Sequence, residues 1–257
     1  MLSPAVLAKF RRANEHISEL RNDFAEWNKT STALNGELSA DGLTFRLDLV
    51  ITKQPDLERW SLIFGDAIHN MRAALDIWMR ERIVAESKRE PKSIYFPIRV
   101  DEKGFDTWEA SARRQGIREE TILALRTIQP FLADSALGQN VLRHIHELDI
   151  ADKHKHILEL RLQPQSAGLT KVSGFMQPDP ASDFDIVFHP VDVTAGGTIV
   201  EVKSSAILRS ASVEPQIQLI PYYVFKGLQC ELWENLEKYS IHLQGLLAII
   251  EGRIQQP

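Results

Sequence analysis

Apolar side chains recur at helical spacing from the start of the chain. The pair Ser3-Pro4 is a good helix start, because serine can cap the first turn and proline is tolerated at the first helical position. Apolar residues then follow at alternating spacings of four and three: Val6, Phe10, Ala13, Ile17, Leu20, Phe24 and Trp27. The pattern predicts a helix of about seven turns with one apolar stripe, which packs in a core or on a partner helix.

The segment after this helix has the two-residue period of a β-strand. Asn35-Gly36 and Asp41-Gly42 are turn signals. Apolar residues then alternate with mostly polar ones at Leu43, Phe45, Leu47, Leu49 and Ile51. The segment therefore predicts a β-hairpin with one buried face.

Helical patterns return after Pro55-Asp56 and fill the middle of the chain. A long helix is expected at about 57–88, and its charge-rich end around Glu86 is expected to be solvated. We expect a short extended segment at 95–98. Further helices are predicted at about 104–114, 118–131 and 139–156.

Between 157 and 225 the pattern changes to short alternating stretches. Pro, Gly, Ser and Asp separate these stretches at 163–168, 177–183, 194–197 and 210–215. This spacing predicts four or five antiparallel strands. A last helix is expected at about 229–253.

Helices on both sides of the β segment favour a single α+β domain, 1–257, over two sequential domains. We predict a helical bundle of four to six helices with an N-terminal β-hairpin and an antiparallel β insertion before the last helix. Residues 57–156 would form the helical core and 157–225 the β-rich insertion. The helix at 229–253 would pack on the bundle.

Composition places the chain among ordinary globular proteins. Hydrophobic residues make up 44% and charged residues 25%, which disfavours disorder and coiled-coil rods. Cys230 is the only cysteine, so no intramolecular disulfide can form and a reducing cytoplasm fits best. The apolar stretch near the N-terminus is too short for a secretory signal, and no apolar run reaches the ~20 residues of a membrane helix. We therefore expect a cytoplasmic protein without a membrane partner.

Charge and missing motifs narrow the function classes. The net charge of -5 argues against an extended basic surface for nucleic acids, although a local basic site stays open. The chain contains no GxxxxGK[ST], GxGxxG, HExxH or GxSxG motif and no paired CxxC. The sequence therefore gives no support for the common nucleotide-binding, zinc-protease and hydrolase sites.

A first polar cluster lies at 65–76. His69, Arg72, Asp76 and Arg80 fall within about 80° of one another on a helix, opposite its apolar arc. One interpretation is a solvated face with ion pairs between residues four apart. The other requires a second helix to cover this face, so that His69 and Arg72 converge on a substrate or ion.

A second cluster at 143–156 holds four of the eight histidines. On a helix, His146, Asp149, Lys153 and His156 share one arc of about 80°. A neighbouring arc carries Arg143, Glu147, Ile150 and His154. Apolar residues lie on nearly every other side, which is typical of a helix that is mostly buried. Its charged groups would then have to pair internally.

The two clusters support three kinds of site. His146 and Asp149 stand three residues apart, a spacing that metal ligands use in helical bundles, but no closed set of three or four ligands is present. We therefore expect neither a metal nor another cofactor. If the helices face each other, His69 or His146 could act as acid or base while Arg72 and Lys153 stabilise a phosphate. A structural network is the third alternative, in which aspartates neutralise Arg72, Arg143 and Lys153; these aspartates are Asp76, Asp149 and Asp152.

At these clusters the sequence resembles a group of uncharacterised bacterial proteins with a GDxxHNLRxALDH segment followed by LxxLDxxDKHR. The first segment is matched by Gly65, Asp66, His69, Asn70, Arg72, Ala74, Leu75 and Asp76. The second is matched by Leu148, Asp149, Asp152, Lys153 and His154. Ile77 replaces the group's second histidine, which weakens any scheme needing two histidines on the first helix. The resemblance covers about residues 60–160. It implies a shared site more than a shared function, because the group has no established activity.

The helical architecture also has a looser similarity to HEPN-type bundles, many of which are ribonucleases of toxin or defence systems. Their Arg-x4-6-His motif is not met by Arg72 or by Arg143. The similarity therefore implies an architecture and residue types, and it carries over no catalysis.

Together these patterns predict a structural or ligand-binding module with a polar site between two helices. The helix with His69 should pack beside the helix with Asp152, and Arg72 or Asp76 should lie within salt-bridge distance of the second cluster. The alternative is a metal-independent, ribonuclease-like phosphodiesterase of a toxin or defence system. Its catalytic candidates are His69, Arg72, His146 and Lys153. The binding or structural network comprises Asn70, Asp76, Arg143, Asp149, Asp152 and His154. The partner would be an unknown ligand or RNA, or a second copy meeting an apolar helix face.

Overall fold

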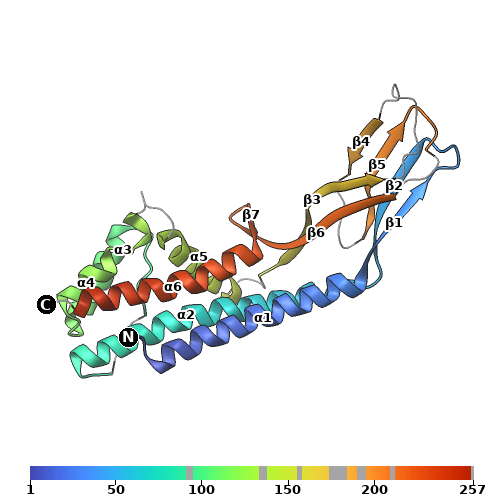
Figure 1. Cartoon of the computed structure of the whole chain (residues 1–257). Helices are drawn as coiled ribbons and strands as arrows, with labels where there is room; N and C mark the ends of the chain where they lie inside the picture. Colours follow the sequence, from blue (N-terminus) through green and yellow to red (C-terminus); the bar gives the residue numbers. More distant parts are fainter. Residues whose placement is uncertain are drawn as a thin grey trace. The chain divides into compact units, whose positions relative to one another are not determined.

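The computed structural model describes residues 1–90, 95–132, 138–154, 158–173, 184–189, 195–208 and 212–255. These residues form six α-helices, one short 3-10 helix and antiparallel strands, which confirms the predicted α+β class (Figure 1). The chain divides into two compact units. We call Met1–Leu20, Arg59–Leu158 and Trp233–Pro257 the helical unit, and Arg21–Glu58 with Glu159–Leu232 the β unit. The expected single domain stays a prediction.

The six helices lie close to their expected positions. They are α1 (Pro4–Ser31), α2 (Leu57–Ser87), α3 (Glu102–Arg114), α4 (Glu119–Arg126), α5 (Gly138–His154) and α6 (Leu232–Gln255). Ser3 caps α1 as predicted, because its Oγ accepts a hydrogen bond from the Val6 amide at 3.2 Å.

Long helices pack against one another in the helical unit (Figure 1). Asn14 on α1 accepts a hydrogen bond from Ser240 on α6, and Trp78 on α2 donates to Glu251 on α6. Their inner faces bury large apolar side chains, including Phe10, Phe64, Ile68, Met71, Leu75 and Tyr239. Burial of this apolar surface is the main contribution to the stability of such a bundle.

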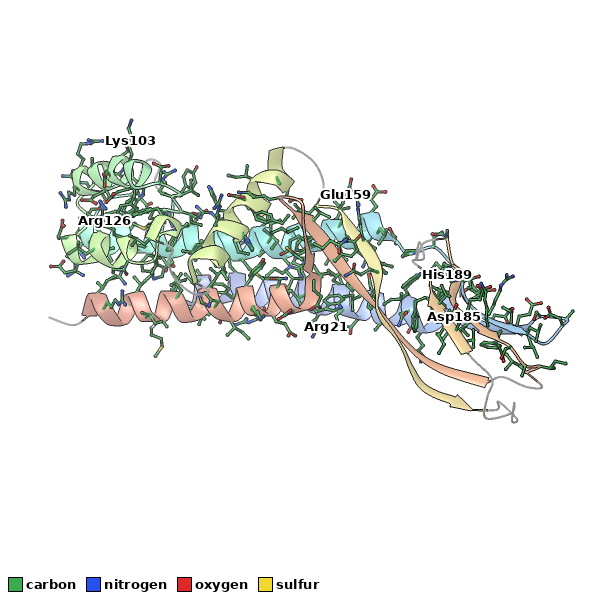
Figure 2. The ribbon with its side chains drawn as sticks, turned by 90° about the horizontal axis from the view of Figure 1, so that it is seen from above. Arg21, Lys103, Arg126, Glu159, Asp185 and His189 are labelled. Atoms are coloured by element: carbon green, nitrogen blue, oxygen red, sulfur yellow. The ribbon has the colours of Figure 1, made fainter. Side chains whose placement is uncertain are left out.

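Two shorter helices complete the helical unit. Arg126 on α4 pairs with Glu102 and Asp106 on α3. Figure 2 labels Arg126 on α4 and Lys103 on α3. The predicted helix at 118–131 was too long, because α4 ends at Arg126 and a 3-10 turn, η1, follows at Pro130–Leu132. Pro130 explains the break, since proline disfavours helical geometry in the residue before it.

The β unit contains two antiparallel sheets. One has the order β1-β2-β5-β4, with β1 at Thr32–Leu38, β2 at Thr44–Ile51, β4 at Phe184–Phe188 and β5 at Gly197–Ser204. The other has the order β3-β6-β7, with β3 at Leu160–Ser173, β6 at Ser212–Phe225 and β7 at Leu228–Glu231. The N-terminal hairpin is confirmed as β1 and β2, and Phe45, Leu47 and Leu49 form its buried face.

Several predicted turns of the β unit need correction. Asn35-Gly36 lies inside β1, where a Cβ on Gly36 would stand 2.7 Å from Phe45 Cζ, so the glycine is needed for close packing. Segment 163–168 lies within β3, which accommodates Pro164 through a register shift. Most of 210–215 belongs to β6. In the described part of the turn predicted at 194–197, residue 195 is a turn and Gly196 has φ +77°, whereas residue 194 and the segment 177–183 lie outside the described residues.

The last helix begins later than predicted. Residues 228–231 pair with β6 as strand β7, so α6 starts at Leu232 and continues to Gln255. Hydrogen bonding to a neighbouring strand therefore overrides the helical period at 229–231.

Candidate ligand-binding site

A glycine lets α2 and α5 approach closely within the helical unit. A Cβ on Gly65 would stand 2.5 Å from Asp152 Oδ1, too close for any other residue without movement of that carboxylate. One turn further along α2, His69 Nδ1 lies 3.1 Å from Asp149 Oδ1. The expected side-by-side packing of these two helices is therefore observed.

The ion pairs between the two helices differ from the prediction. His69 makes the contact to the second cluster, whereas Arg72 Nη2 bonds Asp76 Oδ1 at 2.8 Å on its own helix. Lys153 Nζ likewise bonds Asp149 Oδ2 at 2.8 Å within α5. Among the described residues, no ion pair joins Arg72 or Asp76 to α5, so the expected salt bridge is not found there. Arg72 instead reaches segment 95–99, where its Nη2 donates to the Phe96 carbonyl.

That segment, 95–99, is held in place by buried polar side chains. Its Phe96 amide donates to Asp76 Oδ1 at 3.0 Å, and its Phe96 carbonyl accepts from Arg72 Nη2 at 3.0 Å. The buried amide of Gln129 accepts from the Arg99 amide at 2.9 Å and donates to the Pro97 carbonyl at 3.1 Å. These bonds fix the backbone beside α2 and thereby fix where Tyr95 and Arg99 project.

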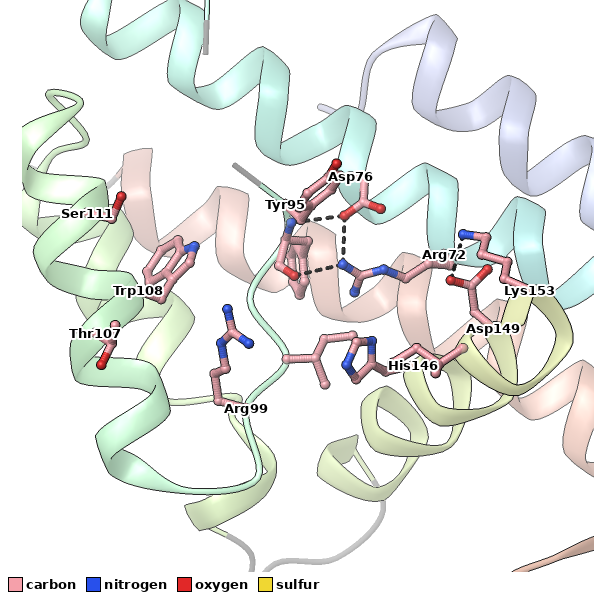
Figure 3. A pocket seen from close by; sticks show the side chains of 13 residues that line it. Arg72, Asp76, Tyr95, Arg99, Thr107, Trp108, Ser111, His146, Asp149 and Lys153 are labelled. Atoms are coloured by element: carbon pink, nitrogen blue, oxygen red, sulfur yellow. Dashed lines mark hydrogen bonds and ion pairs between the residues drawn. The ribbon is translucent and has the colours of Figure 1, made fainter. Parts of the chain in front are cut away.

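A cavity of about 570 Å³ opens between α2, segment 95–99, α3 and α5 (Figure 3). Its walls combine cations, carboxylates, hydroxyls and aromatic rings. The lining residues are Arg72, Asp76, Tyr95, Phe96, Ile98, Arg99, Thr107, Trp108, Ser111, His146, Asp149, Ile150 and Lys153. The volume lies within the range of pockets that enclose small molecules, about 300–1,000 Å³.

Two buried donors in this wall have no hydrogen-bond partner among the described residues. They are Arg72 Nη1 and Trp108 Nε1. Each of the two residues is only 6% exposed. Leaving such a donor unpaired costs about 1–3 kcal/mol. Arg72 and Trp108 both line the cavity, so an acceptor atom of a ligand that reaches these two donors would remove that cost.

The charges around the cavity leave a positive excess. Arg72, Arg99 and Lys153 face the carboxylates of Asp76 and Asp149, three cations against two anions. Burial, and then the charges of Arg72 and Arg99, lower the pKa of His146 to about 4, so its imidazole is neutral near pH 7. The cavity is therefore suited to a group with negative charge.

Burial changes the acidity of two carboxyl groups at the junction of α2 and α5. It raises the pKa of Asp76, against the opposing effect of the Arg72 charge. The pKa of Asp152 is also raised, first by burial and then by Asp149 and Asp66. Both shifts reflect the cost of moving a carboxylate out of water.

The predicted site residues do not all meet in the cavity. It brings together Arg72, Asp76, His146, Asp149 and Lys153. His69, with 46% of its side chain exposed, is not part of the lining, although it bonds Asp149.

The remaining predicted residues lie elsewhere. Asn70 accepts a hydrogen bond from Lys9 on α1 and donates to the Asp66 carbonyl, and Arg143 pairs with Glu147. Neither belongs to the expected network. Asp152 contributes to the α2–α5 contact beside Gly65, and the side chain of His154 lies outside the described residues.

The residues of the wall that were not predicted as site residues include Tyr95, Arg99 and Trp108. Tyr95 was noted only as part of an extended segment, and Trp108 lies in a short helix that drew no functional hypothesis. Their role depends on the return of segment 95–99 to α2, which no local pattern predicts. The nearest sequence signal is an arginine that directly follows the apolar 95–98 stretch.

The described ranges contain neither a cluster of metal ligands nor a membrane-spanning helix. Within them, no three His, Cys, Asp or Glu side chains are grouped in a way that could hold a metal ion. None of the helices in these ranges combines the length and the apolar character needed to cross a membrane.

Comparisons with protein-family models, curated proteins and solved structures gave no match for this chain. The similarity to the bacterial group and to HEPN-type bundles therefore stays a prediction. A function has to be argued from the geometry of the cavity.

Proposed function

We propose that the protein is a ligand-binding module whose cavity takes the oxyanion group of a small molecule. The observation that carries this proposal is the pair of buried donors without a partner among the described residues, Arg72 Nη1 on α2 and Trp108 Nε1 on α3, both on residues that line the cavity. Native proteins rarely leave buried donors unpaired, so such a pair on a cavity is a feature of a binding site.

Charge supports an anion as the bound group. A guanidinium donates strong, charge-assisted hydrogen bonds to carboxylate, sulfate and phosphate oxygens. Arg99 adds a second guanidinium, and Figure 3 draws its side chain between Trp108 and His146. Nη2 of Arg72 already donates to Asp76 and to the Phe96 carbonyl, whereas its Nη1 has no partner among the described residues and can donate to a ligand.

The test is a calorimetric titration of the full chain with inorganic phosphate and with sulfate at low ionic strength. Arg99→Gln and Trp108→Phe should each weaken binding, the first by about tenfold, because a hydrogen bond to a charged group contributes about 1.5–3 kcal/mol. Arg80→Gln is the matched control, since this exposed arginine pairs with Glu90 and does not line the cavity. Equal affinities for all three variants, or no anion binding, would contradict the proposal.

A metal-independent phosphodiesterase is the second candidate. It is favoured by the neutral imidazole of His146 beside Arg72 and Arg99, because a neutral histidine can accept a proton while arginines stabilise a phosphate. The general acid would have to be another group, since His69 is not part of the cavity lining. Labelled RNA incubated with the protein and a chelator provides the test. Cleavage that is lost in His146→Gln, at an unchanged melting temperature, is the expected result for this candidate.

A further inference from the structure

The cavity is larger than an inorganic anion requires. Its volume of about 570 Å³ lies in the range of pockets that enclose small organic ligands, about 300–1,000 Å³. The oxyanion group of the proposed function would therefore be one end of a larger molecule. The rest of the wall should then carry features that recognise the other end.

The available donors favour a tetrahedral oxyanion. They come from three directions, because Arg72 lies on α2, Arg99 in segment 95–99 and Trp108 on α3 (Figure 3). A carboxylate presents its acceptors in one plane, whereas a phosphate presents oxygens in several directions. Guanidinium groups match phosphate geometry well. The three donors are therefore best satisfied together by a phosphate group.

Tyr95 and Asp76 provide a second, different recognition surface. Tyr95 lines the cavity yet is 67% exposed, so a face of its ring is open to a flat partner. Asp76 lines the same cavity, and its Oδ1 accepts from the amide of Phe96, the residue that follows Tyr95 (Figure 3). The hydrogen bonds to Asp76 end on Oδ1, and its Oδ2 accepts none from any residue that the structure describes. An open aromatic face beside a free carboxylate oxygen suits a heteroaromatic ring that carries N–H groups.

We infer that the cavity binds a nucleoside monophosphate, with the phosphate at Arg72, Arg99 and Trp108 and the base stacked on Tyr95 beside Asp76. This inference rests on the proposed oxyanion site and names its ligand class. A free mononucleotide fits better than a polynucleotide, because the cavity has an excess of one positive charge and the chain has a net charge of -5. The site does not depend on any of the glycine-rich nucleotide-binding motifs.

Binding of a small panel of ligands to the full chain tests the inference. The probes are inorganic phosphate, ribose 5-phosphate, the four ribonucleoside 5′-monophosphates and a short single-stranded oligoribonucleotide. At least one mononucleotide should bind about tenfold or more tightly than ribose 5-phosphate, since base stacking on an aromatic ring has an effect of this order. Tyr95→Ala should remove that advantage and leave phosphate affinity unchanged. Tyr95→Phe should bind like the parent, and Val100→Ala, exposed and outside the lining, is the control.

The outcomes separate this inference from the proposed function. If phosphate binds but no mononucleotide binds better than ribose 5-phosphate, the nucleotide inference is wrong and the oxyanion site stands. Tighter binding of the oligonucleotide than of every mononucleotide would also overturn the inference, in favour of a nucleic-acid partner. If neither phosphate nor any nucleotide binds, both proposals fail.

Discussion

At the scale of single residues, Asp76 has the most exacting role in the site. Its Oδ1 accepts from the buried guanidinium of Arg72 and from the Phe96 amide, so one oxygen joins α2 to segment 95–99. Asp76→Ala should lower the free energy of unfolding by roughly 2–4 kcal/mol, because it leaves a buried cation with one partner fewer. Urea denaturation provides the measurement. Glu90→Ala is the control, with an expected effect below about 0.5 kcal/mol, since 68% of the Glu90 side chain is exposed.

The surroundings of Glu86 show a limit of prediction from sequence. Glu86 lies in a charge-rich stretch and was expected to be solvated, but only 3% of its side chain is exposed. It accepts hydrogen bonds from the Arg118 amide and the Thr121 hydroxyl. Composition of a stretch cannot reveal that another segment covers it. A loss as small for Asp76→Ala as for Glu90→Ala would show that the Arg72 pairing contributes little.

His146 should give the fold a specific dependence on pH. The pKa of His146 is about 4 in the fold, below the value of about 6.5 in an unfolded chain. As pH falls, the unfolded chain therefore takes up the proton first, so this stabilising contribution is complete above about pH 6.5 and is lost toward pH 4. Between pH 7 and 4.5 the parent should lose about 1–2 kcal/mol more than His146→Gln, allowing for solvent screening.

The difference between the two proteins isolates the histidine. Asp76 and Asp152 have raised pKa values, so their protonation in the fold favours stability at low pH, with the opposite sign, in parent and variant alike. Urea denaturation of both proteins at several pH values gives the measurement. Parallel curves across this range would mean that His146 is not held neutral by its surroundings.

At the scale of elements, the contact between α2 and α5 depends on Gly65. Gly65→Ala should cost about 1–3 kcal/mol, because the added methyl group meets the Asp152 carboxylate. In an Asp152→Ala background the same change should instead stabilise by about 0.5–1 kcal/mol, since alanine has the higher helix propensity and the obstacle is gone. Gly245→Ala on α6 is a matched control for propensity, because a Cβ there would have no neighbour within 4 Å.

One outcome of this double-mutant cycle would contradict the predicted contact between the two residues. If Gly65→Ala has the same effect with and without Asp152, the two residues are not in contact. Thermal or urea unfolding of the four proteins is sufficient, because the predicted effects differ in sign.

The helices show how much of the fold the sequence could predict. The apolar period identified α1, α2 and α5, and the polar arcs correctly suggested that α2 and α5 face each other. The arcs could not say which polar residue would make the contact, because this depends on the axial offset between the helices. Here the offset brings His69 to Asp149 and leaves Arg72 for segment 95–99. The donors that define the cavity were partly missed for the same reason, since they come from segments far apart in sequence.

At the scale of the whole molecule, the chain passes repeatedly between the two compact units. It changes unit after Leu20, after Glu58, after Leu158 and after Leu232. The first of these changes falls inside α1, which runs without a break from Pro4 to Ser31. The units are therefore not joined by a simple linker, and a continuous helix offers a physical route for them to unfold together.

Calorimetry tests whether the chain behaves as the single domain that its sequence predicts. One transition is expected, with equal calorimetric and van't Hoff enthalpies. The reason is that α1 runs through both units and a helix melts cooperatively along its length. Asn22→Pro should separate this transition into two, since Asn22 is exposed, stands just after the change of unit within α1, and proline in a helix interior costs about 3 kcal/mol. Asn22→Ala keeps the helix and should leave one transition. Two resolved transitions in the parent protein would instead identify the helical unit and the β unit as separate domains.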